Sequence, residues 1–314
     1  MGKGIFLGIL AMAFFGLAFV MPLFTPSFSA IEIAIGRYTV YGLISLFILL
    51  SSSFKETKAV FLQHWQFATA LVLSGYIAYY FLIVLGMRYA GASLGTLVNG
   101  GLLPIAASIY ANLRSKDFSM LSLLPSLCLV FFGLGVVHWE DIRSASIEEL
   151  ANSYFGIGLV VVAVCGWAWF SVQNSFFLKQ HRHVSPSVWS CVLGLVCLLI
   201  CIGISIAALL WNPESLRILD LDTSTHELKM FLFTSLVLGL GGSWITTFLW
   251  NKASTLIPMS VLGQFIALEG VFGLTYILLF NQEFPSIFQI IGVSCILAGL
   301  SLSFQLKPQK EALV

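Results

Sequence analysis

The stretch "SVLGQFIALEGVFGLTYILLF", residues 260–280, is almost wholly apolar, yet a carboxylate, Glu269, lies near its middle. The nearest charged residues along the chain are Lys252 and Glu283. At a helical rise of about 1.5 Å per residue, Glu269 would lie about 21–25 Å from either of them. A glutamate side chain cannot reach an aqueous surface over that distance, so the carboxylate must be accommodated within an apolar segment.

The composition of the whole chain indicates what surrounds this segment. Of the 314 residues, 59% are hydrophobic and only 9% are charged, and the mean hydropathy is +0.97. A soluble domain carries about 25% charged residues. The chain is therefore predicted to be an integral membrane protein in contact with the lipid bilayer. Its net charge of +1 provides no basic field, which argues against nucleic acid as a partner.

Apolar runs separated by charged, proline and glycine breaks predict the spanning segments, which need about 20 residues each. Strands of a membrane barrel would alternate in polarity and these runs do not, so we expect an all-α integral membrane fold with ten transmembrane helices. The runs lie near residues 3–21, 31–51, 65–87, 90–112, 119–138, 154–178, 185–211, 229–250, 255–280 and 286–306. The first run also resembles a secretory signal peptide, but it is long enough to span.

Lysine and arginine predict the orientation, because they are enriched on the cytoplasmic side of membranes. With the N-terminus in the cytoplasm, the opposite side carries only Arg88, Arg143, Arg217 and Lys229. The cytoplasmic side carries Lys3, Lys55, Lys58, Arg114, Lys116, Lys179, Arg182, Lys252, Lys307 and Lys310. We expect a multi-pass protein of the plasma (inner) membrane of a prokaryote, with both termini in the cytoplasm.

Cysteine and histidine residues give no sign of a metal or cofactor site. The six cysteines all lie in apolar runs, where they are expected to pack as small apolar residues. The histidines lie at span ends or in loops. The motif "KQHRH", residues 179–183, resembles a metal site at first, but its Lys179 and Arg182 favour a solvated basic loop. The sequence also lacks a glycine-rich phosphate loop with a lysine, so neither ATP nor another cofactor is expected.

The chain repeats itself weakly. Gly8–Gly16 in the first run matches Gly158–Gly166 in the sixth, and "TALVLSG" from Thr69 parallels "TSLVLGL" from Thr234. "FFGLGVV" in the fifth run parallels "ILAGLSL" in the tenth. Apolar helices share letters by chance, but three matches in the same order favour a real repeat. Each half would hold five helices, so the two repeats would be inverted, with a binding site near the bilayer midplane between them.

Several stretches place small residues in the pattern of one membrane family: "AMAFFGLAF", "GRYTVYGLISLFILL", "LGMRYAGASLGTLVNGGLLPIAASIYANL" and "FNQEFPSIFQIIGVSCILAGLSLSF". In these the chain resembles the EamA-like family of the drug/metabolite transporter (DMT) superfamily. The resemblance implies a first EamA-like five-helix repeat at 1–140, a second at 154–306 and a cytoplasmic tail at 307–314. It also implies movement of small organic metabolites or drugs, most often outward. The cavity would be lined by spans 1–4 and 6–9, with spans 5 and 10 in support. The ninth span departs from the family pattern, with "ALEGVFG" where a central proline is usual.

Glu269 is the residue best suited to carry transport. A charge at mid-bilayer costs about 2.5–3.5 kcal/mol on insertion scales, so acids there generally mark ion or substrate pathways. We predict that Glu269 couples a proton or binds a cationic substrate. The alternative is a structural glutamate that only ties helices together. Gln264 lies about 140° from it around an ideal helix, so both face one cavity only if the helix unwinds locally near Gly263 or Gly270.

Polar stripes on other runs predict the remaining site residues. Arg37, Tyr41 and Ser45 fall at helical spacing, and such a stripe normally faces a bundle interior or water. Arg37 could bind a substrate carboxylate or pair with a glutamate; alternatively, it snorkels outward. Aromatic and amide side chains suit a cavity for flat or amphipathic solutes, although aromatic residues also form interfacial belts. The predicted substrate-binding residues are Arg37, Tyr41, Tyr79, Asn99, Trp167, Trp244 and Gln264.

These features favour a secondary transporter over other membrane functions. The expected activity is efflux of a small organic solute by proton antiport through Glu269, with alternating access, in a monomer or weak dimer. A passive facilitator, an importer or a lipid flippase would use the same scaffold with a structural Glu269. An intramembrane enzyme would need a nucleophile–base pair or metal ligands at depth. No histidine lies clearly mid-span and no "HExxH" is present, so an enzyme is not expected.

Overall fold

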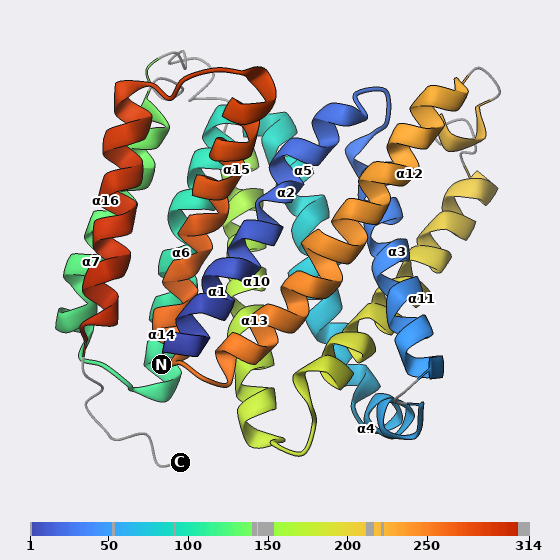
Figure 1. Ribbon diagram of the computed structural model, residues 1–314, viewed down its shortest axis with the longest axis horizontal. Coiled ribbons are helices and arrows are strands. Elements are labelled where there is room, and N and C mark those ends of the chain that lie inside the picture. The colour runs from blue at the N-terminus through green and yellow to red at the C-terminus, as the bar shows by residue number, and fades with distance from the viewer. Residues whose placement is uncertain are drawn as a thin grey trace.

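The computed structural model describes residues 2–51, 54–90, 92–139, 143, 154–211, 217–220 and 223–306. Within these residues the secondary structure is helical throughout, which confirms the all-α expectation. Ten rods of helix cross the molecule side by side (Figure 1). The tail predicted at 307–314 lies outside the described residues.

The first half of the chain contains, in order, α1 (Gly2–Phe15), α2 (Leu17–Val20), the 3-10 turn η1 (Met21–Phe24), α3 (Ala30–Ser51), α4 (Phe54–Val72), the π turn η2 (Leu73–Ile77), α5 (Ala78–Ala90), α6 (Ala92–Ser115) and α7 (Met120–Val137). The second half contains α10 (Tyr154–Gln180), α11 (Pro186–Trp211), the 3-10 turn η4 (Arg217–Leu219), α12 (Thr225–Gly239), the π turn η5 (Leu240–Ile245), α13 (Thr246–Ser254), α14 (Met259–Leu262), the 3-10 turn η6 (Gly263–Phe265), α15 (Ile266–Asn281) and α16 (Ile287–Phe304).

Several of these helices join end to end into single membrane-spanning rods. In the described part of the chain, nine rods are long and apolar enough to cross a membrane by length and composition. The tenth, α6, has 24 residues, or about 36 Å of helix, which exceeds a hydrocarbon core of about 30 Å. The third rod starts earlier than the apolar run at 65–87 predicted, because α4 already begins at Phe54 with a charged first turn.

The two halves of the chain pack in corresponding ways. In the second half α10 packs on α5 and α6, and in the first half α1 packs on α13 and α15. The pair α12 and α3 corresponds in the same way to the pair α4 and α11. In Figure 1, α1 runs upward from the N-terminus, whereas α10 runs downward to the turn before α11. Two five-helix sets of opposite direction therefore form the bundle.

Glycine allows a close helix contact between α7 and α16. A Cβ built on Gly133 would lie 2.6 Å from the carbonyl oxygen of Gly292. One built on Gly292 would lie 2.5 Å from the carbonyl oxygen of Gly133. No side chain fits at either position, which is why small residues favour tight helix pairs in membranes. These two helices pack mainly on each other at one edge of the bundle, away from its centre (Figure 1).

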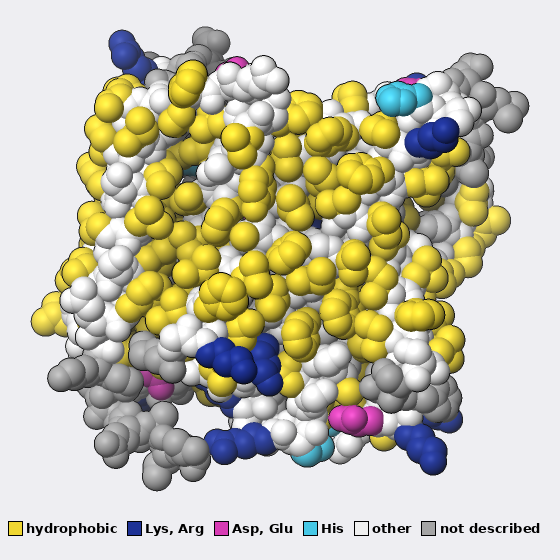
Figure 2. All heavy atoms as spheres, viewed as in Figure 1, with side chains coloured by type: hydrophobic (Ala, Val, Ile, Leu, Met, Phe, Trp, Pro, Cys, Tyr) yellow, Lys and Arg dark blue, Asp and Glu magenta, His cyan; other side chains and the backbone are white. Residues whose placement is uncertain are grey.

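The outer surface matches a lipid environment. Hydrophobic side chains cover most of the face in Figure 2, and the charged side chains gather toward its upper and lower edges. Large apolar residues such as Phe47, Leu121 and Trp211 are exposed on this helical surface. In water so much exposed apolar area would be unfavourable, and in a bilayer it faces the lipid chains.

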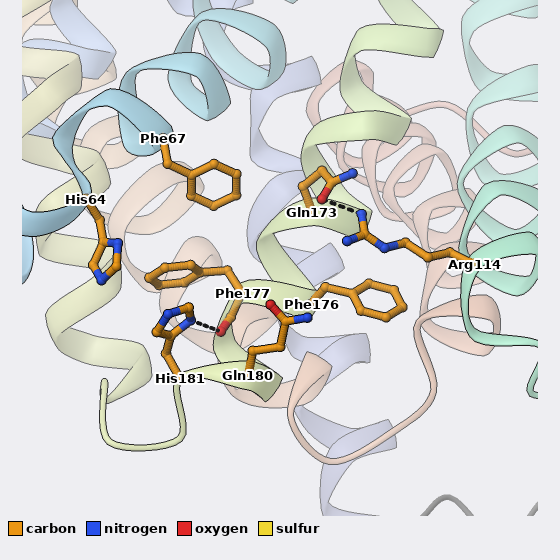
Figure 3. Close-up of a pocket in the computed structure, with 8 residues that line it drawn as sticks. All are labelled: His64, Phe67, Arg114, Gln173, Phe176, Phe177, Gln180 and His181. Atoms are coloured by element: carbon orange, nitrogen blue, oxygen red, sulfur yellow. Dashed lines mark hydrogen bonds between the residues drawn. The ribbon is translucent and has the colours of Figure 1, made fainter.

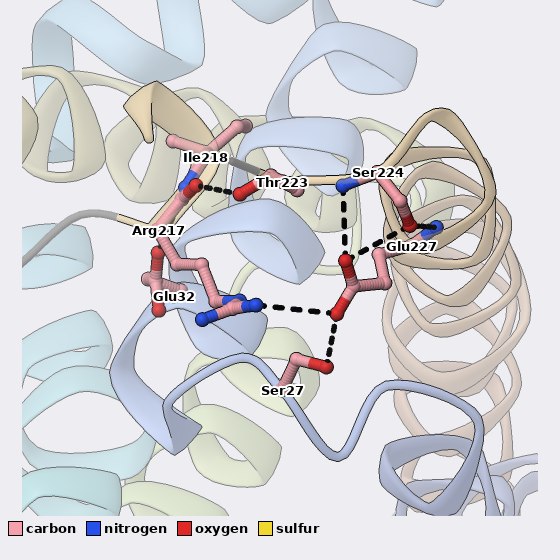
Figure 4. Close-up of polar contacts among 7 residues, drawn as sticks. All are labelled: Ser27, Glu32, Arg217, Ile218, Thr223, Ser224 and Glu227. Carbon is pink, nitrogen blue, oxygen red and sulfur yellow. Dashed lines mark hydrogen bonds and ion pairs between the residues drawn. The ribbon is translucent and has the colours of Figure 1, made fainter. Parts of the chain in front are cut away.

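A polar cluster ties two connecting segments together (Figure 4). The Glu227 carboxylate closes a capping box on Ser224 at the start of α12. It also accepts a hydrogen bond from Ser27 Oγ (2.5 Å) and pairs with Arg217 Nη2 (3.3 Å). Glu32 at the start of α3 accepts from the backbone N–H of Ile218 (3.3 Å). The loops between spans 1 and 2 and between spans 7 and 8 are thereby joined.

Candidate functional site

Arg37 is held inside the bundle by the π turn η5. Its Nε donates to Ser243 Oγ (2.8 Å) and its Nη2 donates to the carbonyl oxygen of Gly242 (2.6 Å). The guanidinium carbon also lies 5.5 Å from the ring centroid of Phe15 and 5.3 Å from that of Tyr38. With 9% of its surface exposed, Arg37 does not snorkel outward and instead faces the bundle interior.

The backbone irregularity explains why an arginine can be held there. In a π turn the hydrogen-bond register shifts from i+4 to i+5, which leaves carbonyl oxygens available to other donors. Gly241 and Gly242 supply the flexible backbone of η5. A second π turn, η2, lies between α4 and α5, just as η5 lies between α12 and α13. Its Gly75 packs closely on α10, since a Cβ there would lie 2.3 Å from the Phe170 ring. Both halves thus carry a π turn near the centre of the bundle.

Glu269 lies in the first turn of α15, and its side chain is half-buried. It lies within electrostatic range of Arg37 and Tyr79. No ion pair joins the Glu269 carboxylate to the Arg37 guanidinium. Among the described residues no hydrogen bond to this carboxylate is present. A partly accessible carboxylate without such a partner can take up a proton or bind a cation.

Tyr79 connects the side chains around Glu269. Its hydroxyl donates to Asn99 Oδ1 (3.2 Å), and its ring centroid lies 6.5 Å from that of Trp167. Arg37 also acts electrostatically on Tyr79. We call Arg37, Tyr79, Asn99, Trp167 and Glu269 the central polar group. The structure therefore brings together five residues that the sequence predicted separately, from five different rods.

Tyr41 and Gln264 occupy different surroundings from the central polar group. Tyr41 is fully buried, and its hydroxyl donates to the carbonyl oxygen of Ser190 (2.7 Å), so it ties α3 to α11. Gln264 is also fully buried, and neither amide atom has a hydrogen-bond partner among the described residues. The helix around it does depart from ideal geometry, through the 3-10 turn η6 at Gly263–Phe265. Its role in substrate binding stays a prediction.

Trp244 lies on the same π turn that holds Arg37. Its half-buried ring stacks on Phe248, with 5.8 Å between centroids and an angle of 9°. In the described residues no ring contact or hydrogen bond joins Trp244 to the Tyr79–Trp167 pair. Trp244 is therefore placed on the segment that binds Arg37. Its predicted contact with substrate stays a prediction.

A buried amide network was not among the predicted site residues. Trp189 Nε1 donates to Asn174 Oδ1 (2.7 Å), Asn174 Nδ2 donates to Asn251 Oδ1 (2.6 Å), and Asn251 Nδ2 donates to Ser190 Oγ (2.9 Å). The network joins α10, α11 and α13, and Asn174, Asn251 and Ser190 are fully buried. The only sequence signal was the presence of amides at mid-run positions. Their pairing depends on helix register, which a sequence pattern does not specify.

Helical rods in two opposed sets, with charged side chains held in the interior, are an arrangement found in many multi-pass membrane transporters. Residues 154–305 match the model of the EamA-like transporter family. The match covers the second half of the chain, which is therefore similar to the EamA-like transporter family. Proteins of this family are generally transporters and not enzymes.

The chain is also similar to individual proteins over most of its length. The chain is 28% identical over 321 residues to the inner membrane protein YtfF of Escherichia coli (strain K12), covering 98% of this chain and 97% of YtfF. It is 26% identical over 234 residues to the uncharacterized transporter YyaM of Bacillus subtilis (strain 168), covering 73% and 70%. A solved crystal structure superposes with a TM-score of 0.76 over 96% of each chain at 15% identity, which supports the fold alone.

Proposed function

We propose that this protein is a secondary transporter that exports a small organic solute by alternating access, and that Glu269 couples export to an inward proton movement. The observation that carries the proposal is the position of Glu269. Its carboxylate lies within a spanning rod, is partly accessible, and has no hydrogen-bond or ion-pair partner among the described residues. A purely structural glutamate would be expected to hold such a partner.

The central polar group suggests the substrate class. Tyr79 and Trp167 offer aromatic walls, and Asn99 adds an amide beside them. Such a lining suits a flat or amphipathic molecule. A cationic group of the substrate would lie at Glu269 and would compete there with the proton. Arg37, already bound to the π turn, would attract an acidic group when the substrate carries one.

We further propose that the protein resides in the inner membrane with both termini in the cytoplasm. The relative from Escherichia coli is named an inner membrane protein. The start of α1 and the turn after α13 lie together at one end, since a Cβ on Gly4 would lie 2.7 Å from Ile257. Lys179 reaches the same turn, with its Nζ 3.3 Å from the carbonyl oxygen of Ile257. Several of the positive charges assigned to the cytoplasm thus share one end of the bundle.

The test is transport by purified protein in liposomes that contain a pH-sensitive dye. Ethidium serves as an aromatic cationic probe and phenylalanine as an aromatic zwitterionic probe. We expect the wild-type protein to move protons in response to at least one probe, and Glu269→Gln to lose that movement. The matched control is Glu283→Gln, which removes an exposed acid just beyond the same rod.

Two outcomes would contradict the proposal in different ways. If Glu269→Gln carries a probe as fast as the wild type from mildly acidic to mildly alkaline pH, the protein is a passive facilitator and Glu269 is structural. If a fluorescent phospholipid changes leaflets while neither probe moves, the scaffold acts as a lipid flippase.

A further inference from the structure

A cavity of about 270 Å³ opens at the end of the bundle where α10 terminates (Figure 3). It lies between α4, α6 and α10, and it is separate from the central polar group. In Figure 3, His64 and Phe67 of α4 line one side and Arg114 of α6 lines the other, with Phe177 of α10 between them. The proposed transport function does not use these residues.

The polar side chains that line this cavity are one arginine, two glutamines and two histidines. Arg114 donates through Nη1 to Gln173 Oε1, and its guanidinium carbon lies 4.5 Å from the ring centroid of Phe176. Gln173 Nε2 in turn donates to Tyr110 Oη (2.9 Å). No aspartate or glutamate is among the described residues that line the cavity. The charge of Arg114 is therefore matched within the cavity only by an amide oxygen.

Two imidazoles complete the lining. The His64 and His181 rings lie 5.0 Å apart, and His181 also stacks on Phe177 at 4.3 Å. His181 Nδ1 is 3.0 Å from the carbonyl oxygen of Phe177, which leaves its Nε2 for another partner. His64 Nε2 is buried and has no hydrogen-bond partner among the described residues. The "KQHRH" motif is therefore not simply a solvated loop, because its first histidine packs into the cavity wall.

A metal ion fits this lining poorly. No group of three histidine, cysteine, aspartate or glutamate residues in the described part of the chain could hold a metal. The positive charge of Arg114 in the lining would also repel a cation. The same donors suit an anion, because arginine binds carboxylate and phosphate oxygens through its fork of N–H groups.

We propose that this cavity binds an anionic group, a carboxylate or a phosphate, with Arg114 as its charged ligand. An ionised oxygen accepts a stronger hydrogen bond from a guanidinium than an amide oxygen does. The anion would therefore displace Gln173 from Arg114 and release a bridge between α6 and α10. The same chemistry could come from a soluble anion or from the headgroup of an acidic lipid at this end of the bundle.

The test measures binding to the purified full-length protein in detergent, at constant ionic strength set with chloride. Inorganic phosphate is one probe. Dioleoyl phosphatidylglycerol is the second, with dioleoyl phosphatidylcholine as its uncharged-headgroup counterpart. We expect at least one probe to raise the thermal unfolding midpoint saturably. Arg114→Gln should weaken the apparent Kd by about tenfold or more, which corresponds to about 1.4 kcal/mol.

Matched variants separate binding from structural damage. Arg182→Gln removes an exposed arginine next to His181 that does not line the cavity, and it should leave the Kd unchanged. Arg114→Lys keeps the charge but loses the fork of N–H groups, so its Kd should lie between those of the wild type and Arg114→Gln. A response to phosphate alone would identify a soluble anion, and a response to phosphatidylglycerol alone would identify a lipid headgroup. The proposal is overturned if neither probe binds saturably, or if Arg114→Gln and Arg182→Gln behave alike.

Discussion

Arg37 and Glu269 both lie inside the membrane-spanning part of the bundle, and their side chains have different partners. Arg37 donates to Ser243 and to the Gly242 carbonyl and packs between two aromatic rings. Glu269 is half-buried and forms neither a hydrogen bond nor an ion pair with the described residues. Arg37 and Glu269 interact electrostatically, but no hydrogen bond or ion pair joins them.

This difference indicates separate roles for the two charges. A guanidinium with fixed partners is part of the architecture, and it sets the potential in which the carboxylate acts. A carboxylate without such partners suits the proton coupling that we propose for Glu269. Substitutions at Arg37 should therefore lower stability, whereas substitution at Glu269 should alter transport and leave stability nearly unchanged.

The largest expected effect is that of Arg37→Ala. It removes two hydrogen bonds from a charged donor and leaves the Gly242 carbonyl without that partner. Hydrogen bonds to charged groups contribute about 1.5–3 kcal/mol each, so we expect a loss of about 3 kcal/mol in the free energy of unfolding. The measurement is unfolding of purified protein by titration with a denaturing detergent. Lys55→Ala, at an exposed position, is the control, and equal stability of Arg37→Ala and wild type would contradict the interpretation.

Arg37→Lys should have an intermediate effect. The lysine ammonium is a compact charge, and it lacks the planar fork of N–H groups with which the Arg37 guanidinium reaches Ser243 and Gly242 together. We expect about half the loss seen with alanine, or about 1.5 kcal/mol. The same detergent titration measures it. A lysine variant as unstable as the alanine variant would indicate that fork geometry, and not charge, holds this site.

Ser243→Ala removes only the hydroxyl partner of Arg37. The bond to the Gly242 carbonyl remains, so the π turn should persist, and a loss of about 1 kcal/mol is expected. The double variant with Arg37→Ala completes a mutant cycle, and it should show a smaller loss than the two single losses added together. Strict additivity would mean that the 2.8 Å contact contributes no stability.

The smallest expected stability effect is that of Glu269→Gln. The side chains have the same shape, and the described residues offer no hydrogen bond for the substitution to break. We expect a change within about 0.5 kcal/mol, as for substitutions away from specific contacts. Unfolding and transport should be measured on one preparation. A loss above about 2 kcal/mol would mean that Glu269 ties helices together after all.

Much of the fold was predictable from local sequence, and part of the site was not. Apolar runs placed the rods, since each run must cross the same thickness of lipid. The residues Arg37, Tyr79, Asn99, Trp167 and Glu269 were singled out because polar groups in apolar runs are costly. The partner of Arg37 was missed, because a π turn depends on how Gly241 and Gly242 pack against another helix. Tyr41 looked equally suited to line a cavity, yet it is sealed between α3 and α11.

The sequence by itself determined that the chain enters a membrane, how many times it crosses, and which polar residues lie at depth. These properties follow from transfer of side chains between water and lipid, which acts on each segment separately. The tertiary structure alone decided which of those polar residues meet, that Arg37 is bound while Glu269 is not, and that Arg114 and His181 share a cavity. These relations depend on the rotation and register of helices distant in sequence, and interlocking side chains and glycine contacts set both.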